Sequence, residues 1–225
     1  MKSRIAILAA LPREVAPLVR DWPVNNVSHR EGTSVWECDR AIVVCAGMGP
    51  KRVTRALELA ESRAQLDSLI SVGYAGALRA GMAVDRVYWP AIVINATTGE
   101  RFECNDGNGT LVTTDHGVGR EEKLRLAARW GADLVDMETA TVARLAQMRN
   151  LPFRTLRAIS DRVKDKLPDL GRFTDERGGF REASFAAYIA LHPWLIPSVF
   201  RLGKRSVQAS QLIAQALRQV LEQAD

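Results

Sequence analysis

The stretch VDMETATVA, residues 135–143, decides the fold class of this chain. It ends a short apolar run, Ala132 to Val135, with a carboxylate and continues as the start of a helix. Short apolar runs between polar segments are typical of strands that are buried on both faces. We therefore expect a buried strand that delivers Met137 and Glu138 to the first turn of the following helix.

A second stretch, LRAISD at residues 156–161, repeats the pattern further along the chain. The run from Phe153 to Ile159 predicts another buried strand, which delivers Ser160 and Asp161 to a loop. Ligands of open α/β sheets bind at the carboxyl ends of strands, so two strand ends separated by one helix can converge on one small molecule. Two acids held in this way can divide the labour, because one stays ionised while the other supplies a proton.

Strands alternate with helices along most of the chain. We expect further strands at 5–11, 34–37, 41–45, 68–72, 86–95 and 111–114, and helices at 13–20, 51–63, 121–130, 180–191 and 206–223. The polar, glycine-containing segments 97–109 and 164–179 are expected to be loops. This alternation predicts an α/β sheet with helices on both faces.

Composition indicates an ordinary globular protein, with 47% hydrophobic and 25% charged residues among 225. The net charge of +5 comes from scattered Lys and Arg residues, so we expect no nucleic-acid partner. The three cysteines and three histidines show no metal-ligand spacing, so we expect neither a metal nor another cofactor. Reduced thiols are typical of the cytoplasm, which is the expected localisation.

Both motifs resemble those of the purine nucleoside phosphorylase and nucleosidase superfamily. The quoted stretches that carry the similarity are 136–138, 157–161, 10–15 (ALPREV), 47–50 (GMGP) and 73–78 (GYAGAL). The similarity is greatest to the branch of methylthioadenosine/S-adenosylhomocysteine nucleosidases and hopanoid-associated phosphorylases. It implies a nucleoside phosphorylase-like fold: a three-layer α/β/α sandwich with a central mixed sheet. This single domain would span residues 1–225, with 192–225 as a C-terminal amphipathic helical extension.

The implied activity is cleavage of the N-glycosidic bond of a purine nucleoside, with adenine as the expected base, in a homodimer or larger homo-oligomer. By the resemblance, Asp161 is the general acid that protonates the leaving purine, which requires a raised pKa. Glu138 accepts hydrogen bonds from the ribose diol and stabilises the oxocarbenium-like transition state. Glu14 orients and deprotonates the attacking water. Met137 packs against the sugar.

The residues alone allow simpler interpretations of these carboxylates. Asp161 could cap the next helix or pair with Arg157 or Arg162. Glu14 and Glu138 could be first-turn helix residues that the helix dipole favours.

Glycine-containing turns are the expected backbone contacts of the ligand. Residues 47–50 and 73–76 are predicted to be strand-to-helix turns, where glycine permits close approach and a helix N-terminus favours anions. The resemblance adds Gly117 and Val118, from the stretch whose backbone reads the purine. The predicted substrate-binding residues are Gly47, Met48, Tyr74, Ala75, Gly76, Gly117, Val118, Met137, Glu138 and Ser160.

Several departures from the family pattern affect the expected chemistry. Ser71 stands where the phosphorylases carry a phosphate-binding arginine, so hydrolysis is favoured over phosphorolysis. Phosphorolysis, with inorganic phosphate as co-substrate held by Arg13, Lys51 or Arg52, is the alternative. Tyr74 and Gly117 reshape the expected pocket, which leaves a non-catalytic nucleoside-binding protein as a further alternative.

The tail is the other departure. Residues 192–198 and the basic residues after them resemble the hopanoid-associated branch, which acts on an adenosylated hopane lipid. A basic, apolar segment predicts weak contact with a membrane surface. The alternative is a pair of helices packed on the core or on a second subunit.

Overall fold

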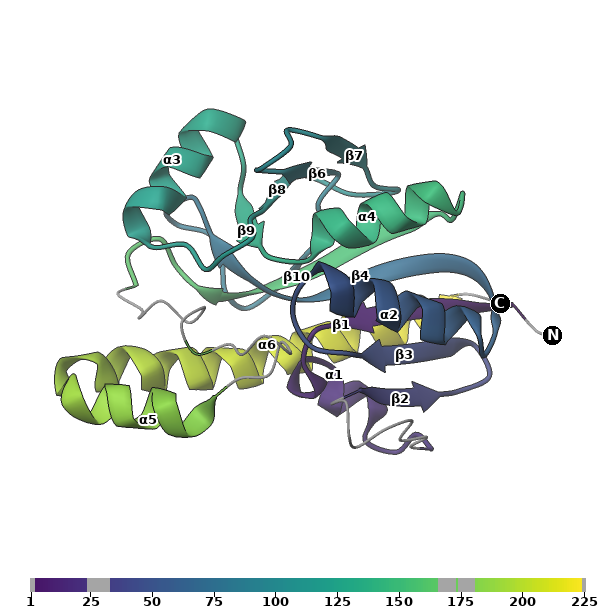
Figure 1. The fold of residues 1–225 in the computed structure, drawn as a ribbon, viewed down its shortest axis with the longest axis horizontal. Helices are drawn as coiled ribbons and strands as arrows, with labels where there is room; N and C mark the ends of the chain where they lie inside the picture. The colour runs from purple at the N-terminus through teal and green to yellow at the C-terminus, as the bar shows by residue number, and fades with distance from the viewer. Residues whose placement is uncertain (1–2, 24–32, 166–172, 174–180, 224–225) are drawn as a thin grey trace.

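The computed structural model describes residues 3–23, 33–165, 173 and 181–223. Within them, a ten-stranded mixed sheet carries helices on both faces, which confirms the predicted α/β/α architecture (Figure 1). The strands are β1 (Ser3–Ala9), β2 (Ser34–Glu37), β3 (Ala41–Cys45), β4 (Gln65–Ala77), β5 (Val87–Tyr88), β6 (Ile92–Asn95), β7 (Arg101–Glu103), β8 (Thr110–Thr113), β9 (Leu134–Asp136) and β10 (Phe153–Asp161). The helices are α1 (Pro12–Val19), α2 (Pro50–Glu61), α3 (Arg120–Trp130), α4 (Thr139–Met148), α5 (Glu182–Leu191) and α6 (Ile196–Gln223), with a short 3₁₀ turn, η2 (Pro193–Leu195), between the last two.

Strand β4 is the centre of the sheet. It pairs in parallel with β1 and β10 and, near its carboxyl end, in antiparallel with β9. Helices cover both faces of the sheet around it, so its middle residues are mostly buried. The last residue of β1, Ala9, pairs with Val72 in the middle of β4, whereas β10 continues beside β4 as far as Gly76.

The strand β4 is longer than the predicted strand at 68–72, and the predicted turn at 73–76 is wrong. Gly73, Tyr74, Ala75 and Gly76 lie inside β4, because β10 pairs with all four and β9 pairs with Gly76. These pairings join segments far apart in the sequence, whereas glycines carry only a local turn signal. No helix N-terminus follows Gly76, so the anion-binding argument does not apply there.

Two further expectations need correction. The predicted strand 86–95 is divided into β5 and β6, with Pro90, which lacks a backbone N–H, between them. The predicted loop 97–109 contains β7, which pairs with β6 in antiparallel. Most of the predicted loop 164–179 lies outside the described residues.

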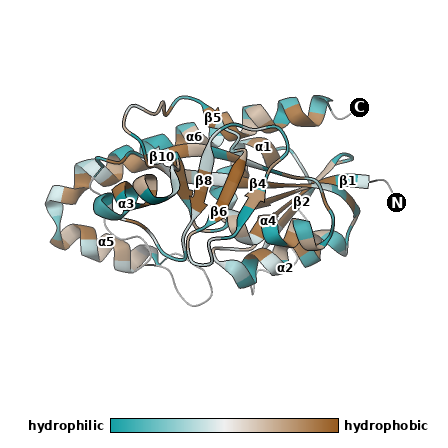
Figure 2. Cartoon of the chain, turned by 90° about the horizontal axis from the view of Figure 1, so that it is seen from above, coloured by the Kyte–Doolittle hydropathy of each residue, from teal (hydrophilic) through white to brown (hydrophobic). Residues whose placement is uncertain are grey.

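Apolar side chains fill the space between the sheet and the helices. Figure 2 shows the hydrophobic residues concentrated in the central strands. Helices α2 and α4 cover one face, and their residues Leu57 and Val142 are buried in the core on that face. Helices α1 and α6 cover the other face. The predicted helix at 206–223 begins earlier, at Ile196, since Pro197 is tolerated in a first turn.

The second half of α6 is part of the core. Leu217 is fully buried in the cluster that joins α1, α6 and β10. We expect Leu217→Ala to lower the free energy of unfolding by about 2–5 kcal/mol, because the substitution leaves a cavity. Val207→Ala, on an exposed part of the same helix, is the control and should change stability by less than about 0.5 kcal/mol. Equal losses in urea unfolding of the two variants would contradict this division of α6.

Candidate active site

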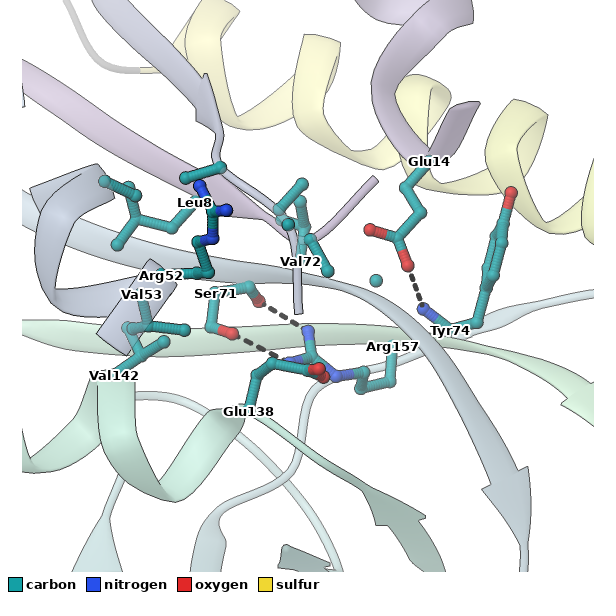
Figure 3. A pocket seen from close by; sticks show the side chains of 16 residues that line it. Leu8, Glu14, Arg52, Val53, Ser71, Val72, Tyr74, Glu138, Val142 and Arg157 are labelled. Carbon is teal, nitrogen blue, oxygen red and sulfur yellow. Dashed lines mark hydrogen bonds between the residues drawn. The ribbon is translucent and has the colours of Figure 1, made fainter. Parts of the chain in front are cut away.

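A cavity opens at the carboxyl end of β1, beside residues 71–74 of β4, and two glutamates from different helices line it (Figure 3). Its empty volume is about 380 Å³, including space open to solvent. The lining residues are Leu8, Ala9, Ala10, Glu14, Ala46, Gly47, Arg52, Val53, Ala56, Ser71, Val72, Gly73, Tyr74, Glu138, Val142 and Arg157. This is the sheet edge at which the sequence predicts a ligand.

Glu14 enters the cavity from the first turn of α1. Its Oε2 accepts the backbone N–H of Leu11 at 2.9 Å, and its Oε1 accepts that of Tyr74 at 3.3 Å. A Cβ at Gly73 would lie 3.1 Å from Oε1, so glycine lets the carboxylate approach β4 closely. Burial raises the pKa of Glu14 even though these N–H groups and Arg157 favour its ionised form. The carboxylate is therefore fixed in place and more basic than an ordinary glutamate.

Glu138 reaches the same cavity from the other side. It is the N-cap residue of α4, directly after β9. Its Oε1 is buried and has no hydrogen-bond partner among the described residues. Burial, together with the neighbouring Asp136 and Glu14 carboxylates, raises the pKa of Glu138 to about 8. A buried polar atom without a partner is costly, and a hydrogen-bonding ligand would satisfy it.

A buried ion pair lies beneath Glu138. The Arg157 guanidinium donates from Nη2 and Nε to Asp136 Oδ2, at 2.8 and 3.1 Å. It also donates from Nη1 to the Ser71 carbonyl at 2.9 Å and from Nη2 to Ser71 Oγ at 2.7 Å. Thr113 Oγ1 donates to Asp136 Oδ1 at 2.7 Å. This network ties β4, β8, β9 and β10 together where the cavity opens.

The sequence analysis missed the role of this ion pair. Asp136 and Arg157 belong to the quoted motifs, and charged residues inside apolar strand runs are the signal that indicates a buried pair. Ser71, the position where the phosphorylases carry arginine, binds a guanidinium that comes from the neighbouring strand. Arginine is thus present in the cavity, although Asp136 and Ser71 already occupy its donors.

Asp161 does not line the cavity. Its carboxylate forms an ion pair with Lys123 of α3 and accepts a hydrogen bond from Ser160 Oγ at 2.8 Å. A Cβ at Gly76 would lie 3.2 Å from Asp161 Oδ2 and 3.0 Å from Lys123 Nζ. Gly73 and Gly76 are three residues apart on β4, so side chains at these two positions would project from opposite faces. Glu14 lies against Gly73 and Asp161 against Gly76, so the two carboxylates approach β4 from opposite sides.

A bulge in β10 sets the position of Asp161. Ile159 pairs with Ala75 and Asp161 with Gly76, which leaves Ser160 as an extra residue. Bulges redirect side chains at strand ends. The simpler interpretation, that Asp161 pairs with Arg157 or Arg162, fails because its partner is Lys123. Lys123 lies three residues before buried Leu126, so helical spacing could have placed it on the inner face of α3.

The remaining predicted contacts divide into two groups. Gly47 and Tyr74 line the cavity, but the Tyr74 ring points towards α6, where its hydroxyl lies 3.1 Å from Ser210 Oγ (Figure 3). The bulky side chain therefore does not fill the cavity. The predicted contacts outside the lining are Met48, Ala75, Gly76, Gly117, Val118, Met137 and Ser160.

The described residues contain no cluster of His, Cys, Asp or Glu that could hold a metal ion. What the cavity offers is two buried carboxyl groups of raised pKa above a neutralised Asp–Arg pair. Such an arrangement can accept hydrogen bonds from hydroxyl groups and can take a proton from a bound water.

The α/β architecture and its cavity resemble those of enzymes. Comparison with known proteins identifies the family. The chain belongs to the phosphorylase superfamily, whose family model matches residues 4–114 and 94–190. A comparison with curated protein sequences found no match.

Solved structures share the fold. One methylthioadenosine/S-adenosylhomocysteine nucleosidase superposes with a TM-score of 0.70 and 16% identity, over 98% of this chain and 96% of that one. The Helicobacter pylori nucleosidase mutant with 5′-methylthioadenosine in its active site gives 0.67 and 16%, over 97% and 100%. A futalosine hydrolase mutant from Helicobacter pylori gives 0.61 and 19%, over 72% and 89%. These similarities confirm the nucleoside phosphorylase-like fold.

The raised pKa of Glu138 predicts how stability depends on pH. An acid that is harder to ionise in the folded state contributes stability below its unfolded pKa, and this contribution is lost as pH rises through the folded value of about 8. We expect Glu138→Gln to remove this loss. Relative to wild type, the variant should gain on the order of a few kcal/mol in free energy of unfolding between about pH 5 and 9. Glu121→Gln, on the exposed side of α3, is the control. A variant that loses as much stability as wild type over this range would contradict the assignment.

The Lys123–Asp161 pair is the second test of the site. Its side chains are 6% and 17% exposed, so removing the cation leaves a nearly buried carboxylate without its partner. We expect Lys123→Met to lower the free energy of unfolding by about 3 kcal/mol, and the Lys123→Met/Asp161→Asn double variant to recover much of it. Additive losses in this double-mutant cycle would show that the two groups do not interact.

Proposed function

We propose that this protein is a nucleosidase, which hydrolyses the N-glycosidic bond of a purine nucleoside, with adenine as the base. The observation that carries the proposal is the unpartnered, buried Oε1 of Glu138, in one cavity with the Glu14 carboxylate. Family membership supports the general reaction. The resemblance of the 135–143 and 156–161 motifs supports the choice of a purine nucleoside.

Glu138 binds the ribose in this proposal. A carboxylate can accept hydrogen bonds from two neighbouring hydroxyl groups, and these bonds favour its ionised form. The free enzyme holds Glu138 with a pKa of about 8, so binding of the sugar releases a proton at neutral pH. The negative charge then stabilises the cationic sugar of the transition state from a buried position.

Glu14 activates the attacking water. Two backbone N–H groups fix its carboxylate, and burial raises its pKa, which makes it a more effective general base. Glu14 and Glu138 line the same cavity, so the proposal places the sugar between their carboxyl groups. This position supports hydrolysis, because a second carboxylate near the anomeric carbon repels a phosphate dianion.

Asp161 is the proposed acid that protonates the leaving base. Its position at the end of β10 follows the resemblance, while its pairing with Lys123 on the other side of β4 does not support direct contact with a ligand in the cavity. For the proposed role, the base must reach the side of β4 on which Asp161 and Lys123 lie.

Phosphorolysis is the second candidate, and one observation favours it. Arg52 and Arg157 both line the cavity, so two guanidinium groups stand near any anion that enters. On this alternative the product is ribose-1-phosphate, and an adenosylated hopanoid becomes a candidate substrate through the resemblance of the tail.

The decisive experiment is chromatography of the free base released from adenosine, methylthioadenosine, adenosylhomocysteine, inosine, guanosine and futalosine, with and without phosphate. Hydrolysis predicts release of base and free sugar without phosphate. Release that requires phosphate would replace the proposal with phosphorolysis. Tight nucleoside binding without release of base would indicate a binding protein instead.

The pKa of Glu138 also predicts a pH profile. If the ionised carboxylate binds the ribose, kcat/KM should rise with pH and level off above about 8, the pKa in the free enzyme. The corresponding limb of the kcat profile should lie at lower pH, since bound substrate favours ionisation. A kcat/KM that is flat between pH 6 and 9 would contradict the role given to Glu138.

Asp161→Asn tests the general acid. An amide cannot donate its proton to the base as a carboxylic acid does, so we expect kcat to fall about 10²–10⁴-fold. Urea unfolding of the same variant separates chemistry from the loss of the Lys123 pair, and Asp85→Asn, at an exposed position, is the control. If Asp161→Asn reduced stability while retaining kcat, Asp161 would be structural.

A further inference from the structure

Helix α5 and the first half of α6 form an arm that extends from the body of the protein. The second half of α6 packs against α1 and β10, whereas its first half and α5 project beyond the sheet (Figure 1). They project on the side towards which β1 runs, the side of the cavity. We call residues 181–207 the arm.

The arm is apolar but not buried. Helix α5 has the sequence EASFAAYIAL, and none of its side chains that the structure describes is buried. Phe185 and Tyr188 contact the Phe173 ring at centroid distances of 5.2 and 5.3 Å. A helix that is apolar on all sides is ordinarily enclosed by protein or lipid.

The exposed apolar residues gather at the bend between the helices and along α6. Of the seven large hydrophobic residues that are exposed in the described part of the chain, five lie in the arm. They are Leu191, Trp194, Ile196, Phe200 and Val207, with exposed fractions of 76, 69, 51, 64 and 62%, and we call them the arm patch.

Helical geometry places the α6 members on one side. At about 100° per residue, Ile196, Phe200 and Val207 point within about 40° of one another. They form a stripe roughly 16 Å long, at 1.5 Å per residue. Trp194 and Leu191 extend the stripe around the bend. Apolar surface of this extent that faces solvent marks an interaction site.

The charge of the arm indicates the partner. From residue 183 to residue 221 the chain carries four basic residues and no Asp or Glu. Two of them flank the stripe: Lys204 lies over the Phe200 ring, with Nζ 4.8 Å from its centroid, and Arg201 donates to Ser198 Oγ at 3.1 Å. Cations beside an apolar stripe match an anionic lipid surface, where the head groups bind the charges and the acyl region takes the side chains.

A second copy of the chain fits this surface less well. Two arm patches placed face to face would bring Arg201 and Lys204 of one chain near the same cations of the other, with no acidic residue in 183–221 to neutralise them. Within the described residues no single helix is long and apolar enough to cross a membrane; the bent pair of α5 and η2–α6 passes that test of length and composition together. Contact with the surface of a bilayer does not require a helix that is long and apolar enough to cross it.

We propose that the arm patch docks the protein on anionic membrane surfaces, with the stripe of α6 inserted at the level of the head groups. Trp194 stands at the bend, and tryptophan is the residue type that concentrates at this depth. The proposal uses no residue of the cavity and does not depend on the reaction.

Vesicle co-sedimentation tests the proposal. The full chain is mixed with phosphatidylcholine vesicles with and without phosphatidylglycerol. We expect binding to the anionic vesicles that weakens as salt is raised, and little binding to phosphatidylcholine alone. Trp194→Ser/Phe200→Ser and Arg201→Glu/Lys204→Glu should each weaken binding at least about tenfold.

Matched controls separate the patch from general surface chemistry. Leu124→Ser/Met148→Ser removes exposed apolar side chains elsewhere, and Arg101→Glu/Arg125→Glu makes the same change of charge elsewhere; both should bind like wild type. All variants change exposed side chains, so release of base from soluble nucleosides should be unchanged.

Three results would overturn the proposal. The first is no binding of wild type to anionic vesicles. The second is equal binding by the arm variants and wild type. The third is sedimentation equilibrium showing a dimer that Trp194→Ser/Phe200→Ser dissociates, which would assign the patch to a second copy of the chain.

Discussion

The geometry of the site depends on the buried pair of Asp136 and Arg157. Desolvating two charges is costly, and the pair is tolerated because neighbouring hydroxyl and carbonyl groups satisfy the remaining donors and acceptors. The pair fixes the backbone that carries Glu138. The guanidinium reaches from β10 across β4 to Asp136 at the end of β9, one residue before Met137 and two before Glu138. Removing either charge would leave its partner buried and alone, so the pair constrains both the fold and the cavity.

The Asp136–Arg157 pair also explains how the Glu14 and Glu138 carboxyl groups can both be buried in one cavity. Arg157 favours the ionised forms of both Glu14 and Glu138, yet burial outweighs it and the pKa of each is raised. The fold thus holds two acids whose pKa values are both raised by burial. A site of this kind is destabilising by itself, and the apolar packing of β4 between two helical layers supplies the stability that offsets it.

Much of this could be predicted from local sequence. Apolar runs that end in carboxylates predicted β9 and β10. They also predicted the side of the sheet on which Glu14 and Glu138 line one cavity. Two predictions were wrong for the same reason, because strand pairing joins residues that are far apart in the sequence. Gly73 and Gly76 resemble turn residues, but pairing with β9 and β10 extends β4 through them. Asp161 is redirected by a bulge in the pairing of β10 with β4. Lys123, its partner, lies on a helix in another part of the chain.

Helix α6 is continuous from Ile196 to Gln223, with one end built into the core and the other in the arm. A straight helix transmits orientation, because its hydrogen-bonded backbone resists bending over this length. An anchor on the outer turns therefore fixes the orientation of the inner turns, and with them the orientation of the sheet against which they pack.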